Sequence, residues 1–269
     1  MKLCRFQLLM FNAQISRSAA RARPEPLIGA ISGETVREVS GDVFGAWKPA
    51  ARSWPLDQVK LLPPVMPSKI VCLGRNYSEH AAELGNTVPK EPLIFLKPPS
   101  SIIGPEEPIE LPPISQRVDY EGELAVVIRR KCAQLGPQDD VRPYILGFTC
   151  LNDVTARDLQ KQDGQWTRAK GFDTFCPLGP VIETVLDPAA TRIETYVNGQ
   201  RRQSAPATEM IFSVDTVVRW ISRMMMLLPG DVIATGTPAG ISPLHPGDVV
   251  EVVVEGVGRL RNPVVAHDS

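Results

Sequence analysis

The chain has 269 residues, of which 43% are hydrophobic and 22% charged, an ordinary globular composition for one sizeable domain with a small appendage. The formal net charge of −1 gives no electrostatic basis for binding nucleic acid or an anionic membrane surface. Because no apolar run approaches the roughly 18 residues that a membrane span needs, we expect neither nucleic-acid nor membrane partners.

The cysteine pattern indicates the compartment. Five cysteines lie at wide, irregular spacing without a CxxC motif, so neither a zinc site nor a disulfide framework is expected. Cys72, Cys150 and Cys176 lie among apolar neighbours and are predicted to be buried thiols. Met1 to Arg23 lacks the apolar core and cleavage site of a signal peptide. We therefore expect a reducing, cytoplasmic location.

Short β-rich runs separated by 26 prolines and 20 glycines favour an α+β, predominantly β fold over an alternating βαβ sheet. Residues 1–60 carry weak strand signals, such as Leu27–Ile31, and are expected to form a small N-terminal domain. The proline-rich stretch 61–68 is a predicted linker, because proline suits neither a helix interior nor a sheet. Residues 69–269 are expected to form the main domain. Its stronger strand signals cover Lys69–Leu73, Leu93–Leu96, Val118–Ile128 and Tyr144–Leu151.

A predicted strand ending at Gly74 leads into a short helix that carries His80. On that helix His80 and Glu83 are three residues apart and share one face. A carboxylate beside an imidazole orients the ring and raises its basicity, which suits a general base that activates water. An exposed helical ion pair is the alternative. The turn formers in residues 76–90 predict a mobile lid over the site.

Two carboxylates share one face of the predicted strand Val118–Ile128. Side chains alternate along a strand, so Glu121 and Glu123 point the same way. Their mutual repulsion would make burial costly without a counter-charge, which a divalent cation can supply. Gly122 between them suits a close backbone approach. A solvated face of an edge strand is the alternative.

A third acid, Asp153, follows the predicted strand Tyr144–Leu151, where a short helix is expected to begin. Three carboxylates without Cys or His would form a hard oxygen site that suits Mg²⁺ or Mn²⁺. A simple helix N-cap role for Asp153 is the alternative.

Two lysines and one turn are further candidates for binding an anion. Lys97 ends an apolar strand, and Lys170 lies in a short polar segment. Either ammonium could hold a substrate carboxylate or stabilise an enolate, although an ordinary solvated lysine is the simpler interpretation. The turn Thr235–Pro238 offers backbone N–H and hydroxyl groups to an oxyanion.

A helix is predicted over about Val214–Leu227, with Ser213 as its N-cap and Pro229 after its end. The methionine run 224–226 is expected to fill the core. Two Pro-Gly-Asp-Val tetrads, at Pro229 and Pro246, are predicted to be type II-like turns that lead into strands. The apolar face of the helix is expected to comprise Val214, Val217, Val218, Ile221, Met224, Met225 and Leu228.

In chain order these motifs resemble the fumarylacetoacetate hydrolase family over nearly all of residues 69–265. The matching stretches are Gly74–Tyr77 with His80, Phe95–Pro98, Glu121–Glu123, Asn152–Asp158, Ala169–Asp173 and Thr235–Pro238. The resemblance implies a mixed β-sandwich roll with a small N-terminal domain, and a homodimer.

The resemblance also implies the roles of the site residues. Mg²⁺ or Mn²⁺ would be bound by Glu121, Glu123 and Asp153, with Ca²⁺ able to take the site in a crystal. Catalytic roles would fall to His80, Glu83 and Lys170. Substrate contacts are expected from Arg75, Asn76, Lys97, Gln160 and Thr237.

The expected substrate is a small acylpyruvate or related 2-oxo or 1,3-dicarbonyl acid, which the metal would chelate as an enolate. If His80 and Glu83 activate water, a C–C bond is hydrolysed, and this is the main expectation. The alternative is a 2-hydroxyhepta-2,4-diene-1,7-dioate isomerase or an oxaloacetate-type decarboxylase, as found in aromatic-acid degradation. In a third interpretation, a catalytically silent metal-binding scaffold, His80 and Lys170 would be dispensable.

Overall fold

The computed structural model describes residues 1–9 and 25–267 of the chain. The expectation about a signal peptide over Met1–Arg23 therefore falls mostly outside the described residues. Among the helices that are described, none is both long enough and apolar enough to span a bilayer.

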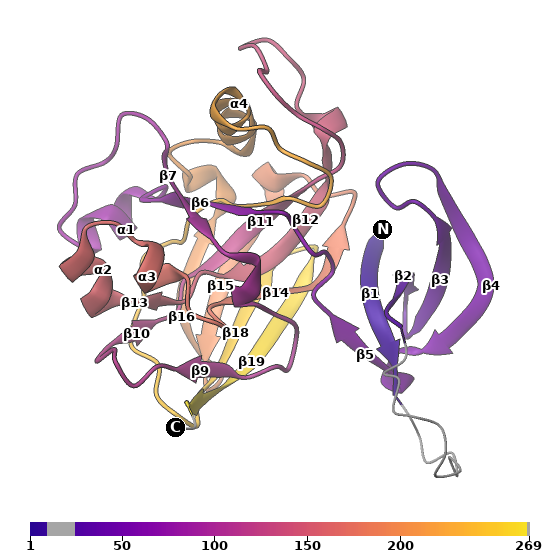
Figure 1. The fold of residues 1–269 in the computed structure, drawn as a ribbon, viewed down its shortest axis with the longest axis horizontal. Coiled ribbons are helices and arrows are strands. Elements are labelled where there is room, and N and C mark those ends of the chain that lie inside the picture. Colours follow the sequence, from indigo (N-terminus) through magenta and orange to yellow (C-terminus); the bar gives the residue numbers. More distant parts are fainter. Residues whose placement is uncertain (10–24, 268–269) are drawn as a thin grey trace.

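An N-terminal layer of antiparallel strands lies beside the rest of the molecule (Figure 1). Its strand β1 pairs with β2 and β5 and also with β14 of the main sheet, where Leu3 lies opposite Ile182. Leu61 and Leu62 belong to β5 and pair with β1, so the predicted linker begins two residues too early. The strands of this layer are β1 (Lys2–Leu8), β2 (Leu27–Ser32), β3 (Thr35–Gly41), β4 (Trp47–Pro55) and β5 (Val59–Leu62).

The main sheet continues from β14 in the order β14-β12-β11-β17-β6-β7. Only the contact between β17 and β6 is parallel in this series, and the other pairs are antiparallel. Each strand signal predicted from Lys69 to Leu151 corresponds to an element here. The strands are β6 (Ile70–Gly74), β7 (Leu93–Lys97), β11 (Gly122–Ile128), β12 (Ile145–Asn152), β14 (Cys176–Glu183) and β17 (Val232–Ala234), and β8 (Ile102–Ile103) pairs with β14.

Strand β11 is buried along its whole length because both faces of the sheet are covered. Leu124 and Val126 pack into one hydrophobic cluster, and Ala125 and Val127 into another, as the period of two predicts. Cys72, Cys150 and Cys176 are free and buried in the same interior, which confirms that prediction.

The predicted strand Val118–Ile128 is interrupted at Tyr120 and Glu121. The short strand β10 (Val118–Asp119) pairs with β13 (Thr155–Ala156), whereas β11 pairs with β12 and β17. At the break, the Glu121 N–H donates to the side-chain oxygen of Asn152 at 2.9 Å and not to a backbone carbonyl of a neighbouring strand. The interruption places Glu121 between two sheets.

A second sheet and four helices complete the described part of the chain, which has an α+β, predominantly β fold as predicted (Figure 1). The sheet has the order β16 (Gln200–Pro206), β15 (Arg192–Val197), β18 (Val249–Val254), β19 (Gly258–Ala266) and β9 (Ile109–Leu111). The helices are α1 (Ser78–Glu83), α2 (Arg157–Asp163), α3 (Thr167–Lys170) and α4 (Val214–Met224). Short 3₁₀ turns cover Leu56–Gln58, Pro99–Ser101, Arg142–Tyr144, Pro188–Ala190 and Ala207–Glu209.

Helix α4 begins as predicted, with the Ser213 side chain accepting from the Thr216 N–H, but it ends at Met224. It stops early because Leu227 instead exchanges two backbone hydrogen bonds with Cys132. Met224 is consequently 51% exposed and Leu228 is 37% exposed, so neither belongs to the buried face that the spacing predicted. The prediction that the methionine run fills the core is wrong for Met224 and for Met226, which is 45% exposed, and only Met225 packs against the core.

The two Pro-Gly-Asp-Val tetrads form the predicted turns. Gly230 and Gly247 have φ values of +86° and +94°, as the third position of a type II turn requires. Asp231 and Asp248 each accept a hydrogen bond from the N–H three residues earlier. Strands β17 and β18 follow directly.

Candidate active site

Three buried carboxylates converge where β10 gives way to β11. Glu123 lies on β11, Glu121 immediately precedes that strand, and Asp153 follows β12. The antiparallel register sets Gly122 opposite Asn152, and the Asp153 N–H donates to the Glu121 carbonyl at 2.8 Å. One carboxylate oxygen from each acid lies within 4.8 Å of the others. The structure thus brings together the three acids that the sequence singled out.

Gly122 is required between the two glutamates. A Cβ at this position would lie 2.0 Å from the hydroxyl of Thr195 on β15. The close approach that the sequence predicted is therefore a contact between the two sheets.

Two of the three acids are neutralised by cationic side chains. Arg157 and Lys170 donate to the two oxygens of Glu121 at 2.5 and 2.9 Å. Lys97 and Lys170 donate to the two oxygens of Asp153 at 2.6 and 2.5 Å. Burial opposes ionisation of Glu121, but Lys170 and Arg157 outweigh it and hold its pKa well below the usual range. Glu121 is therefore ionised.

Within the described part of the chain, Glu123 has no cationic partner of its own. One of its oxygens accepts from the Gly236 N–H at 2.7 Å, and the other is buried without any hydrogen-bond partner among the described residues. Burial, and then the charges of Asp153 and Glu121, raise its pKa well above the usual value. An additional positive charge beside Glu123 would satisfy this oxygen. The arrangement fits a divalent cation held by oxygen ligands.

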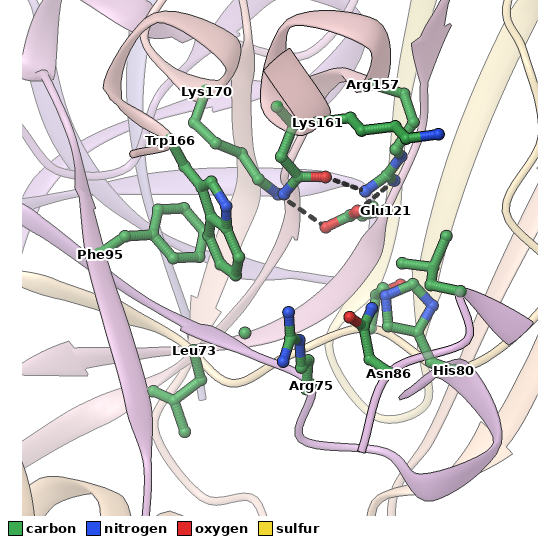
Figure 2. A pocket seen from close by; sticks show the side chains of 14 residues that line it. Leu73, Arg75, His80, Asn86, Phe95, Glu121, Arg157, Lys161, Trp166 and Lys170 are labelled. Carbon is green, nitrogen blue, oxygen red and sulfur yellow. Dashed lines mark hydrogen bonds and ion pairs between the residues drawn. The ribbon is translucent and has the colours of Figure 1, made fainter. Parts of the chain in front are cut away.

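A cavity of about 390 Å³ opens onto Glu121. Figure 2 shows Phe95 and Trp166 on one side of it, and His80 with Asn86 on the other. The two rings pack edge to face with centroids 5.2 Å apart, so that wall is apolar. The cavity is therefore lined by an apolar wall, the imidazole of His80 and one carboxylate of the cluster, Glu121.

His80 and Glu83 form a pair on α1, beside the cavity. His80 lies on α1 with only 5% of its surface exposed, and its Nδ1 is 3.3 Å from a Glu83 oxygen. The Glu83 carboxylate also accepts from the Gly240 N–H at 3.1 Å, in the loop after β17. The alternative of an exposed helical pair is wrong for His80, which is buried and lines the cavity, whereas Glu83 is exposed.

Three of the five predicted substrate contacts line the cavity, namely Arg75, Gln160 and Thr237. Gln160 accepts from Arg157 at 2.7 Å. The Thr237 hydroxyl donates to the Gly122 carbonyl at 2.9 Å, which fixes it beside the carboxylate cluster.

Asn76 and Lys97 do not line this cavity. The Asn76 amide donates to the carbonyls of Phe212 and Thr235, at 3.0 and 2.7 Å, and accepts from the Phe212 N–H. Lys97 is fully buried behind Asp153 and also donates to the Val154 carbonyl. Asn76 and Lys97 therefore hold neighbouring backbone and side-chain groups in place.

Arg157 and Trp166 are residues that the sequence argument missed. Arg157 contacts Glu121 and, at 3.0 Å, the completely buried Asp119. An arginine inside the matched run Asn152–Asp158 was the available signal, but its partners lie more than thirty residues away. Trp166 carried no signal, because a single aromatic residue in a polar segment predicts nothing specific.

Comparisons with known proteins agree with this geometry. Residues 69–265 match the family described as "Fumarylacetoacetate (FAA) hydrolase C-terminal", and residues 20–64 match "Rv2993c-like, N-terminal". The chain is 51% identical over 241 residues to Protein Rv2993c of Mycobacterium tuberculosis, covering 88% of this chain and 91% of that one.

Several relatives carry names that state an activity, and two of them are compared here. The chain is 42% identical over 245 residues to the mitochondrial oxaloacetate tautomerase Fahd2a of Rattus norvegicus, covering 87% of this chain and 77% of that one. A solved 2-hydroxyhepta-2,4-diene-1,7-dioate isomerase from Mycobacterium marinum is 44% identical, with a TM-score of 0.87 and 100% of both chains covered.

The family match spans the carboxylate cluster, the His80–Glu83 pair and the residues that line the cavity. It also covers most of the chain. This protein is a member of the fumarylacetoacetate hydrolase family.

Proposed function

We propose that the protein is a divalent-metal-dependent keto–enol isomerase of a small 2-oxo diacid of the oxaloacetate type. The tautomerase and the isomerase described above are 42% and 44% identical to this chain, whereas two solved hydrolases, a fumarylacetoacetate hydrolase from Exiguobacterium antarcticum and a maleylpyruvate hydrolase, are 36% and 28% identical. The tautomerase and isomerase reactions both move a proton and a double bond, and neither breaks a C–C bond. Hydrolysis, the main expectation from the sequence, is therefore less well supported than its alternative.

The observation that carries the proposal is that His80 and Glu121 line one cavity. Glu121, Glu123 and Asp153 would hold Mg²⁺ or Mn²⁺, which favour carboxylate oxygens. When bound, such an ion polarises a 2-oxo group and disperses the negative charge that forms when the neighbouring carbon loses a proton. Lys170 donates to two of the carboxylates and so fixes the cluster's geometry.

A keto–enol shift needs a group that exchanges a proton with the carbon beside the 2-oxo group. Glu83 lies against Nδ1 of His80 and orients the ring, which leaves Nε2 for the substrate proton. No attacking water is needed for this shift. We propose His80 as the base, Glu83 as the group that orients it, and Arg75, Gln160 and Thr237 as substrate contacts.

The test compares two reactions in one preparation. With Mn²⁺ present, we expect the protein to accelerate oxaloacetate tautomerisation, measured by enol absorbance, more than cleavage of acetylpyruvate. His80→Ala should lower tautomerisation by roughly 10²–10⁴-fold, the usual contribution of a general base. His245→Ala, at an exposed histidine in a turn, is the matched control. Faster cleavage than tautomerisation in the unmodified protein would restore hydrolysis as the better interpretation.

The proposal retains three expectations from the sequence, which are a homodimer, a cytoplasmic location and a mobile lid over residues 76–90. Light scattering should report the mass of two 29.5 kDa chains. Hydrogen exchange in the lid should slow when oxalate and Mn²⁺ are added, because closure over the cavity protects the backbone.

A further inference from the structure

Arg75 lines the cavity and forms no ion pair with any residue that the structure describes. Its guanidinium points into the cavity from the side opposite α2 and α3, between Trp166 and Asn86 (Figure 2). Among the described residues, no carboxylate or carbonyl accepts a hydrogen bond from it. An arginine is always charged, and one partly withdrawn from water without a counter-ion favours an anionic ligand.

The backbone holds Arg75 in a conformation that is unfavourable for its residue type. Its φ is +59°, in the left-handed region that non-glycine residues rarely adopt. The conformation is enforced on one side by Asn76, whose buried amide makes three hydrogen bonds. On the other side, Gly74 lies so close to Trp166 that a Cβ would meet the indole at 2.7 Å. Strain of this kind is concentrated at ligand-binding positions.

Arg75 forms no ion pair with any carboxylate of the cluster among the described residues. Arg157 and Lys170 already pair with Glu121, and Lys97 with Lys170 pairs with Asp153. Arg75 is therefore available to an anion that enters the cavity.

We infer that Arg75 binds the distal carboxylate of the substrate and so selects diacids over monoacids. This inference rests on the proposed function, in which the 2-oxo end of the substrate lies at the carboxylate cluster. The other end then projects across the cavity, toward the side from which Arg75 enters. The planar fork of a guanidinium donates two parallel hydrogen bonds to a carboxylate, and Asn86 lies beside it to donate another.

The test measures binding with matched pairs of 2-oxo acids of four to six carbons. Each pair comprises a diacid and the monoacid of the same length, for example 2-oxoglutarate and 2-oxopentanoate. Calorimetry with the Mn²⁺-loaded protein should show that at least one diacid binds about tenfold or more tightly than its monoacid. Arg75→Met should reduce this preference to within about twofold and leave monoacid binding unchanged.

Lys161→Met is the matched control, because Lys161 also lines the cavity but is exposed at its rim. It should keep the diacid preference. Equal loss in both variants would mean that a general positive field, and not contact with Arg75, attracts the diacid, and this would overturn the inference. An unmodified protein without any diacid preference would overturn it as well.

Arg75→Lys decides the question if Arg75→Met fails to fold. It keeps the charge but loses the fork, so the diacid preference should fall several-fold. Full retention would contradict the inference. Because binding is measured without turnover, a diacid preference that depends on Arg75 in a protein that does not tautomerise oxaloacetate would refute the proposed function alone.

Discussion

Glu123 is the one carboxylate of the cluster whose charge the chain leaves uncompensated. When folding raises the pKa of a carboxyl group, the folded state is destabilised at each pH at which the same group is ionised in the unfolded chain. That loss is absent below the ordinary carboxyl pKa and grows as the pH rises toward the raised pKa of the folded protein. Without metal, Glu123→Gln should therefore be more stable than the unmodified protein at neutral pH, and the difference should vanish in acid.

Urea unfolding in EDTA at a series of pH values measures this difference. The same variant should lose Mn²⁺ binding, because the amide cannot supply the charge that the site offers the ion. Glu91→Gln, at an exposed glutamate, is the control and should change neither quantity. Parallel stability curves for the two variants across the pH range would show that Glu123 is not the destabilising carboxylate.

At the scale of elements, α1 is tied to the loop after β17 by one backbone donor. The Gly240 N–H donates to Glu83, and Gly240 has a φ of +106°. A Cβ there would lie 2.1 Å from the Arg202 carbonyl, so Gly240→Ala must displace the loop. His80 would lose the support of Glu83, and turnover should fall about tenfold or more while Mn²⁺ affinity is retained.

Gly247→Ala is the control for this element. Gly247 also has a positive φ, of +94°, but a Cβ there would meet nothing within 4 Å. It therefore introduces the same type of backbone strain without a clash and without a link to α1. A similar loss of turnover in both variants would mean that strain, and not the connection to Glu83, lowers the rate.

At the scale of the whole molecule, the metal should stabilise the fold. The three proposed ligands come from the start of β11 and the end of β12, in the centre of the main sheet, and Lys170 reaches them from α3. An ion that binds only the folded state adds about 2.7 kcal/mol when its concentration is a hundred times its dissociation constant. Thermal unfolding should shift upward with Mn²⁺ and return after EDTA. An unchanged transition would contradict the metal site.

The sequence predicts those features that depend on residues close together in the chain, and it does not predict those that depend on contacts between distant residues. The alternation along Val118–Ile128 correctly assigned the two faces of β11, because that pattern is local. The same pattern could not reveal the break at Glu121, which arises from a hydrogen bond to Asn152. The three acids could be identified because each stands in a short local pattern, either on one face of a strand or directly after a strand. The burial of Lys97 behind Asp153 depends on a contact 56 residues away, which no local pattern records.

The pairing of β1 with β14 constrains the order in which the molecule is assembled. Leu3 pairs opposite Ile182, so this one pairing of β1 must wait until most of the chain has been made, although its other partners, β2 and β5, exist early. The hairpins within β2–β4 need no such delay, since their contacts are close in sequence. Closing a long loop costs entropy before any contact stabilises it. During synthesis on the ribosome, the N-terminal layer should therefore form locally first and join the main sheet late.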